Sequence, residues 1–166
     1  MEHSGTLKWR FDVSTFRLIG RDLITDRVTA LFELVKNCYD ANATKVTVKF
    51  DNVGLDKQNS AITISDDGFG MSFADIRDKW MVIGTSNKRS NPYTPLPFHR
   101  KCVGEKGIGR FAVDKLGDKV NIIAKQEGEN DWLNVEIDWE SYYNNSNNQQ
   151  LSLFTDIENH YEFYSA

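Results

Sequence analysis

Three polar side chains recur at helical spacing in an otherwise apolar segment near the start of the chain. At about 100° per residue, Glu33, Asn37 and Asp40 fall within a stripe roughly 60° wide on a helix. A second, apolar stripe, which we expect to face the core, consists of Val28, Leu31, Val35 and Cys38. Two carboxylates and a carboxamide in one line can hold a metal ion, activate a water molecule or simply face solvent. This segment alone leaves the three alternatives open.

An Asp-x-Gly-x-Gly pattern follows a strand that alternation of apolar and polar side chains predicts over residues 61–65. The pattern consists of Asp66, Gly68 and Gly70, with Met71 after it. Two glycines one residue apart let the backbone adopt positive φ and let a flat ligand approach it closely. The aspartate can accept a hydrogen bond from an exocyclic amine such as that of adenine. The alternative is an ordinary Asp-Gly turn.

A glycine-rich run, Gly104–Gly109, leads into a short apolar helix predicted to end near Gly117. Glycines at the start of a helix expose unpaired N–H groups and the positive end of the helix dipole, which suits phosphate. Lys106 and Arg110 add positive charge. The segment Gly107–Ala112 also fits the dinucleotide pattern G-x-G-x-x-A. The residues before it are too polar and too rich in glycine to be the buried strand which that pattern needs.

In this order, the motifs resemble the ATP-binding domain of the GHKL superfamily, which DNA gyrase B, the heat-shock chaperones of ninety kilodaltons, histidine kinases and MutL-type repair proteins share. Its Glu-x-x-x-Asn box is matched by Glu33 and Asn37, followed by the Asp-Ala of Asp40. Its Asp-x-Gly-x-Gly box is matched at Asp66, and Ile83–Lys88 is similar to its Gly/Ala-Thr-Ser-x-Lys segment. The local sequence is closest to the MutL, MORC and heat-shock chaperone branches.

The resemblance implies a role for each box. Glu33 would be the general base that orients and deprotonates the attacking water, and Asn37 would supply the one protein oxygen to Mg²⁺. Asp66 would bind the adenine amino group of ATP or ADP. Asp40 would contact the nucleotide through water, brace the lid or cap the helix end. The complete nucleotide-binding set is Asn37, Asp40, Asp66, Gly68, Gly70, Met71, Thr85, Ser86, Lys88, Gly104, Lys106, Gly107, Ile108, Gly109, Arg110 and Phe111.

A carboxylate at Glu33 favours hydrolysis, because histidine kinases as a class carry a residue there that is not a base. We therefore expect slow, Mg²⁺-dependent ATP hydrolysis, with closure of a lid as a switch for a protein client, a downstream domain or an ATP-dependent homodimer. The alternative is a module that holds ATP or ADP as a signal without turnover. A histidine-kinase catalytic domain is the less favoured third reading.

The composition is that of one domain covering residues 1–166. The chain is 40% hydrophobic with four tryptophans, enough to bury a core without disulfides or metal. A net charge of −4 gives no support to nucleic-acid binding over the whole surface, although a local basic run that includes Arg100-Lys101 can contact DNA. Cys38 and Cys102 form no Cys-x-x-Cys pattern. No apolar leader or membrane span is visible, so we expect a cytoplasmic protein without membrane contact.

The expected fold is a two-layer α/β sandwich, the Bergerat fold, with a mixed sheet and helices on one face. Helices are predicted over residues 25–40 and, from a Ser72/Asp75 capping box, to residue 80. Strands are predicted over residues 45–50, 61–65, 119–125 and 132–139. The polar, proline-containing residues of about 84–107 form the predicted lid, expected to be mobile without nucleotide. The family's further strand is not recognisable in residues 151–166, so the chain is expected to be a fragment.

Overall fold

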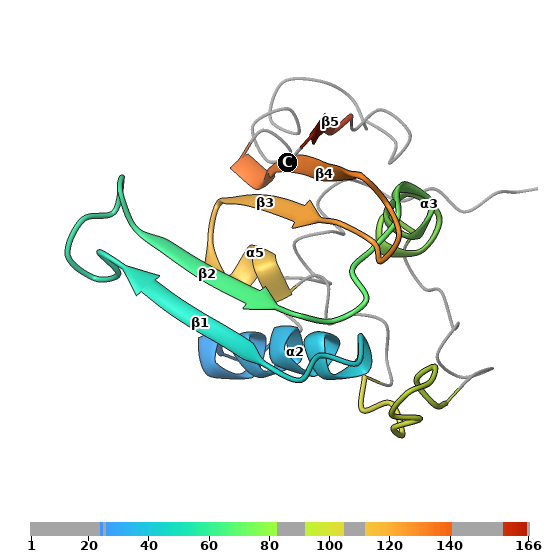
Figure 1. Cartoon of the computed structure of the whole chain (residues 1–166). Helices are drawn as coiled ribbons and strands as arrows, with labels where there is room; N and C mark the ends of the chain where they lie inside the picture. The colour runs from blue at the N-terminus through green and yellow to red at the C-terminus, as the bar shows by residue number, and fades with distance from the viewer. Residues whose placement is uncertain (1–23, 25, 83–91, 105–111, 141–157, 166) are drawn as a thin grey trace, which may run out of the picture.

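The computed structural model describes residue 24 and residues 26–82, 92–104, 112–140 and 158–165. Its elements, in order, are α2 (Arg27–Asp40), β1 (Val46–Asp51), β2 (Ala61–Asp66), α3 (Phe73–Asp75), the π-helix η2 (Ile76–Trp80), α5 (Ala112–Leu116), β3 (Lys119–Ala124), β4 (Asp131–Asp138) and β5 (His160–Ser165) (Figure 1). The α/β class is confirmed. The long helix and the four predicted strands differ from their expected bounds by at most two residues at either end.

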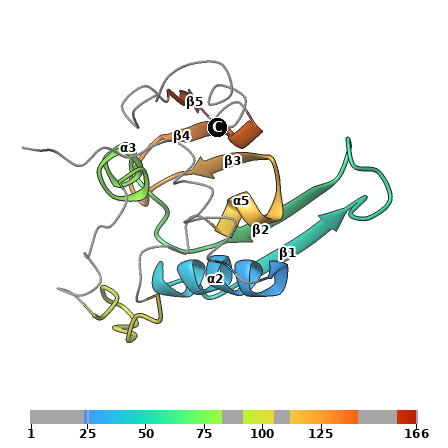
Figure 2. The same ribbon diagram turned by 180° about the vertical axis from the view of Figure 1, so that it is seen from behind.

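The strands form two antiparallel sheets. In the first, β1 and β2 make a hairpin with Val46 opposite Asp66. In the second, β4 lies between β3 and β5, with Lys119 opposite Asp138 on one side and Asp131 opposite Ser165 on the other. The mixed sheet expected from the sequence is thus seen as antiparallel pairs only, among the strands that the structure describes. Figure 2 shows α2 and α5 close together below β3.

Helix α2 begins and ends at well-formed caps. The Asp26 carboxylate accepts the Thr29 N–H at 2.8 Å. At the other end, Asn42 adopts a left-handed φ of 64°. The N–H of Asn42 donates to the Tyr39 carbonyl at 3.0 Å, and that of Ala43 donates to the Cys38 carbonyl at 3.1 Å. These two bonds form a Schellman motif, with asparagine where glycine is usual.

The inward face of α2 differs from the predicted apolar stripe. Val28 is 64% exposed, whereas Ala30 and Cys38 are buried. Ala30 packs in a small cluster with the fully buried Ala112 of α5, and Leu34 lies against the same cluster. The two alanines let α2 and α5 approach closely, and this turns the line Ala30, Leu34, Cys38 inward. Glu33 and Asn37 therefore border the packed face and do not lie opposite it.

The main core lies under the second sheet. Leu133, Val135, Ile137 and Trp139 of the β4 segment pack with Ile76 of η2. The predicted capping box is confirmed: the Ser72 hydroxyl accepts the Asp75 N–H at 3.1 Å, and the Asp75 carboxylate accepts the Ser72 N–H at 3.0 Å. This cap starts the α3 and η2 turns that cover the core.

Strand β5, within residues 151–166, was not among the strands predicted from the sequence. His160–Ser165 pairs along β4, and the Tyr161 and Phe163 rings lie 4.8 and 6.0 Å from the Phe73 ring. Alternating aromatic residues favour a pleated surface that is packed on one side, so this signal was present in the sequence. The strand contains no threonine, whereas the resemblance implies a further strand that carries one.

Membrane spans and metal clusters are both absent from the described residues. None of their helices combines the length and the apolar character that a membrane crossing needs. They also contain no group of three or more His, Cys, Asp or Glu side chains able to hold a metal ion.

Candidate functional site

The Asp-x-Gly-x-Gly turn lies directly against the C-terminal end of α2. The Phe69 N–H donates to the Ala41 carbonyl at 2.9 Å. A Cβ on Gly68 would lie 2.6 Å from the same carbonyl oxygen, so the approach requires glycine. Burial, together with the nearby Asp66 carboxylate, raises the pKa of the Cys38 thiol to about 12. The turn and the helix that carries Glu33 and Asn37 therefore meet in one corner.

Gly70 fixes the other side of this turn. Its φ is +69°, and a Cβ there would lie 2.0 Å from the Lys125 carbonyl oxygen. The Glu127 N–H donates to the Phe69 carbonyl at 3.2 Å. The sequence suggested that both glycines serve positive φ and a close ligand. In the structure only Gly70 has positive φ, and both glycines allow close contact with protein backbone.

Asp67 ties the turn to the start of β1. Its carboxylate accepts the N–H groups of Thr44 and Lys45 at 2.7 and 2.8 Å, and the Thr44 hydroxyl at 2.5 Å. The hydrogen bond from the Thr44 side chain, followed by those from the backbone, lowers the pKa of Asp67 to about 2. The sequence gave no sign of this role, because the partners lie 22 or 23 residues earlier.

We expect Asp67→Asn to lower the melting temperature at neutral pH. Because the pKa of Asp67 is lowered on folding, its contribution is complete above the ordinary value of 3.8 and disappears as the pH falls through about 2. The difference in melting temperature should therefore shrink between about pH 4 and pH 2. Asp56→Asn is the matched control, because Asp56 is also exposed but its hydrogen bonds to described residues, Gln58 and Asn59, stay within its own turn. A difference that stays constant down to about pH 2 would contradict the assignment.

The three residues with the most specific predicted roles carry groups suited to them. Asp66 is exposed, and one carboxylate oxygen accepts the Gly68 N–H at 2.9 Å. The half-buried Glu33 carboxylate pairs with Lys36 at 2.7 Å, one turn from Asn37. Within the described residues, no hydrogen bond engages the Asn37 side chain.

Asp40 holds the far end of the predicted lid. Its two carboxylate oxygens accept the N–H groups of Val103 and Gly104 at 2.9 and 3.1 Å. Of the three roles considered for Asp40, this contact is the bracing one. It also places Gly104, the first residue of the glycine-rich run, at the end of α2.

The remaining predicted site residues fall into two groups. Met71 packs against the main core. The others lie outside the described residues, and they are Thr85, Ser86, Lys88, Lys106, Gly107, Ile108, Gly109, Arg110 and Phe111.

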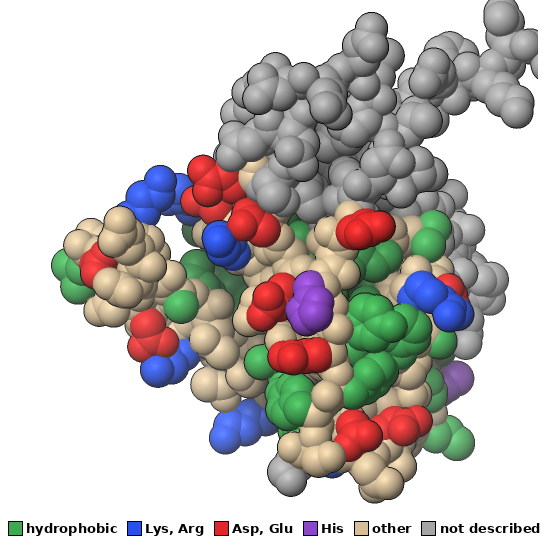
Figure 3. All heavy atoms as spheres, turned by 90° about the horizontal axis from the view of Figure 1, so that it is seen from above, with side chains coloured by type: hydrophobic (Ala, Val, Ile, Leu, Met, Phe, Trp, Pro, Cys, Tyr) green, Lys and Arg blue, Asp and Glu red, His purple; other side chains and the backbone are tan. Residues whose placement is uncertain are grey.

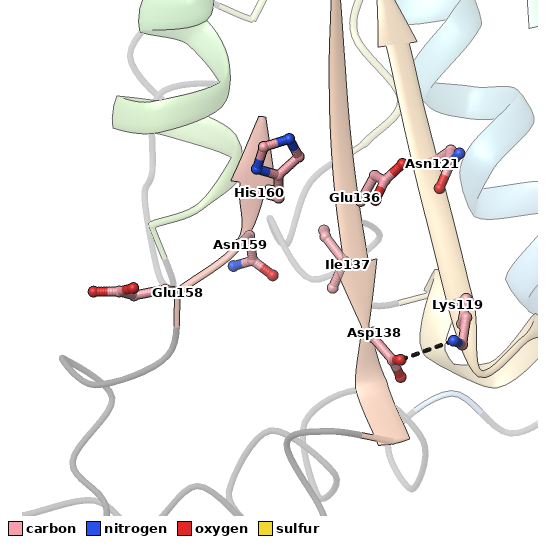
Figure 4. Close-up of a pocket in the computed structure, with 8 residues that line it drawn as sticks. All are labelled: Lys119, Asn121, Glu136, Ile137, Asp138, Glu158, Asn159 and His160. Atoms are coloured by element: carbon pink, nitrogen blue, oxygen red, sulfur yellow. Dashed lines mark ion pairs between the residues drawn. The ribbon is translucent and has the colours of Figure 1, made fainter. Parts of the chain in front are cut away.

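A polar hollow of about 420 Å³ lies elsewhere, along one face of the second sheet (Figure 4). Its lining residues are Lys119, Asn121, Glu136, Ile137, Asp138, Glu158, Asn159 and His160. Lys119 and Asp138 form an ion pair of 3.0 Å across β3 and β4. Figure 3, the view from above, shows a histidine side chain among several acidic side chains. No predicted site residue lines the hollow, so we separate it from the corner at α2.

The corner fits an adenine nucleotide with Mg²⁺ by the chemistry of its groups. An exposed carboxylate can accept a hydrogen bond from the adenine amine, and an amide oxygen is a hard ligand of the kind Mg²⁺ accepts. Mg²⁺ in nucleotide sites takes most of its ligands from phosphate and water, so a single protein oxygen suffices. A helix with Glu and Asn one turn apart, set against an Asp-x-Gly-x-Gly turn in this α/β frame, defines the class of GHKL-type ATPase domains.

Comparison with known proteins gives the family. Residues 25–162 match the family described as histidine kinase-, DNA gyrase B-, and HSP90-like ATPase. The chain therefore belongs to this family, and the resemblance inferred from the motifs is confirmed.

Individual relatives are distant. The chain is 28% identical over 118 residues to a protein of Herpetosiphon aurantiacus named "Putative type II restriction enzyme HgiDII", an alignment that covers 71% of the chain and 18% of the relative. It is 26% identical over 129 residues to the chaperone protein HtpG of Sulfurovum sp., covering 68% of the chain and 21% of HtpG. For HtpG of Natranaerobius thermophilus the identity is 27% over 146 residues, an alignment that covers 82% of the chain and 23% of HtpG. The chain thus spans about a fifth of the length of these relatives.

Proposed function

We propose that the chain binds ATP or ADP with Mg²⁺ in the corner between the end of α2, the Asp66–Gly70 turn and Gly104, and that it hydrolyses ATP slowly. The observation that carries this proposal is the contact of Gly68 and Phe69 with Ala41. It holds the two sequence boxes of the family side by side. Residues 1–166 act as one nucleotide-binding domain in this proposal.

Each residue then has a defined task. Asp66 accepts a hydrogen bond from the adenine amine, and Asn37 supplies an oxygen ligand to Mg²⁺. Glu33 orients the attacking water and takes its proton. When bound, Mg²⁺ neutralises negative charge on the phosphates during transfer. Lys88, Lys106 and the backbone N–H groups of Gly107–Arg110 complete the phosphate contacts.

The nucleotide state would be passed on to partners. We propose that the lid, residues 84–107, changes conformation with the bound nucleotide and so acts as the switch. The partner that recognises this change is a protein client, a downstream domain or a second copy of the chain. Distant relatives named "Chaperone protein HtpG" support a chaperone-like role for this switch. We propose that it acts in the cytoplasm. A module that holds nucleotide without turnover is the second candidate, because the ion pair with Lys36 at 2.7 Å competes with water for the Glu33 carboxylate.

We expect Glu33→Gln to keep nucleotide affinity and to lower ATP hydrolysis by roughly 10²-fold or more, the usual scale for a positioned base. Glutamine retains the shape of the side chain but cannot take a proton at neutral pH. Asn37→Ala is the contrasting variant, because loss of the Mg²⁺ ligand should weaken Mg²⁺-nucleotide binding together with turnover. Phosphate release measures turnover, and calorimetry measures affinity. Unchanged release in Glu33→Gln would refute the catalytic role, and an unmodified chain that binds ATP without releasing phosphate would favour the non-hydrolysing module.

A further inference from the structure

Residues 92–104 form a closed hairpin, although the sequence suggested a segment with little to hold it. The Thr94 N–H donates to the Arg100 carbonyl at 2.7 Å, and the Cys102 N–H donates to the Pro92 carbonyl at 2.8 Å. The Tyr93 and His99 rings stack with their centroids 4.8 Å apart and their planes nearly parallel. These contacts close residues 92–104 on themselves, and the mobility expected for the whole lid stays a prediction.

The hairpin contacts the C-terminal end of α2, and Figures 1 and 2 both show it there. The Arg100 guanidinium donates to the Ala43 carbonyl at 2.7 Å and lies 4.9 Å from the Tyr39 ring. It also lies 4.3 Å from the Phe98 ring, so it is held between two aromatic side chains. The Asn42 amide donates to the Pro95 carbonyl at 2.8 Å.

These contacts follow one another along the chain at the end of α2. Tyr39, Asp40, Asn42 and Ala43 each contact the hairpin, by ring, carboxylate, amide and carbonyl respectively. The Schellman turn at Asn42 directs them outward, and asparagine in place of glycine adds a side-chain contact that glycine cannot make. Among these contacts, those of the Asp40 carboxylate reach the end of the hairpin, at Val103 and Gly104.

We propose that the hairpin 92–104 is a strut that sets Gly104 at the end of α2 before nucleotide binds, and that Asn42 and Arg100 are positioning residues for the nucleotide's phosphates. This inference rests on the proposed function. Asn37, the Mg²⁺ ligand, lies one helical turn before Asp40, and Gly104 begins the run assigned to phosphate. The strut therefore fixes the start of the phosphate loop relative to the metal ligand. A loop held in place before binding loses less conformational freedom when the ligand arrives.

Asn42→Gly tests the strut cleanly, because glycine keeps the left-handed backbone and removes only the amide contact. In the nucleotide-free chain, hydrogen exchange at the Val103 and Gly104 amides should accelerate by about tenfold or more. ATP affinity should fall by about tenfold, roughly the contribution of one hydrogen bond, while adenosine affinity stays the same because adenosine lacks the phosphates. Arg100→Lys should show the same pattern, because lysine keeps the charge but loses the planar group that stacks and donates at once.

Asn52→Gly is the matched control, since Asn52 also has positive φ, at 52°, but lies in the turn after β1. It should change neither exchange at Val103 and Gly104 nor either affinity. Unchanged exchange in Asn42→Gly and Arg100→Lys, or equal loss of ATP and adenosine binding, would overturn the inference. If the unmodified chain binds neither ligand, the proposed function fails and the inference falls with it. If it binds both and the variants keep the same ratio of affinities, only the inference falls.

Discussion

Replacing Gly70 by alanine is expected to destabilise the folded chain by about 3 kcal/mol or more. Two effects combine, a backbone φ of +69° and a Cβ placed 2.0 Å from the Lys125 carbonyl oxygen. The Lys125 carbonyl cannot move away easily, because it belongs to the backbone. The turn should move away from Lys125, and nucleotide binding at the adjacent Asp66 should be lost with it. Urea unfolding measures the first effect and calorimetric titration the second.

Gly128→Ala is the matched control for this prediction. Gly128 has a φ of +90°, but nothing lies within 4 Å of the Cβ position. Alanine there should cost only the backbone strain, about 1–2 kcal/mol, and should leave nucleotide binding intact. Equal losses of stability in Gly70→Ala and Gly128→Ala would show that the close approach to Lys125 does not matter.

Elements with a strong local period could be predicted from the sequence. Alternation predicts β1 and β2, and the Ser72/Asp75 capping box predicts the start of α3. The orientation of α2 could not be predicted in the same way. A stripe of large apolar residues pointed to Val28, but the close packing of Ala30 on Ala112 decided which face turned inward. Small residues carry little weight in an apolar pattern, although they allow the closest helix contacts.

The same contrast, between local patterns and contacts from tertiary structure, applies to the residues of the candidate site. Glu33, Asn37 and Asp66 could be proposed from the sequence because motif spacing lies within one element or one turn. The groups that hold this corner together could not be predicted from the sequence. Arg100 contacts a carbonyl 57 residues earlier, and Asp40 contacts N–H groups 63 and 64 residues later. Such contacts arise from tertiary structure and leave no periodic trace in the sequence.

Asp66→Asn is expected to weaken ATP and ADP binding by at least about a hundredfold. Asparagine keeps an oxygen that can accept the Gly68 N–H, so the turn should fold as before. It replaces the charged acceptor for the adenine amine by a neutral amide whose own N–H₂ group can face that amine. Hydrogen bonds to charged groups contribute about 1.5–3 kcal/mol, and a donor left unpaired in a closed site costs more. The unfolding midpoint without nucleotide should stay close to that of the unmodified chain.

Calorimetric titration of ADP and ATP, in the presence of Mg²⁺, into the unmodified chain, Asp66→Asn and Glu136→Gln tests the location of the nucleotide site most directly. Glu136→Gln makes the same change from carboxylate to amide, but in the polar hollow on the second sheet. The corner at α2 predicts saturable binding to the unmodified chain and to Glu136→Gln, with binding lost in Asp66→Asn. Binding that survives Asp66→Asn and disappears in Glu136→Gln would contradict this account and move the nucleotide to the hollow.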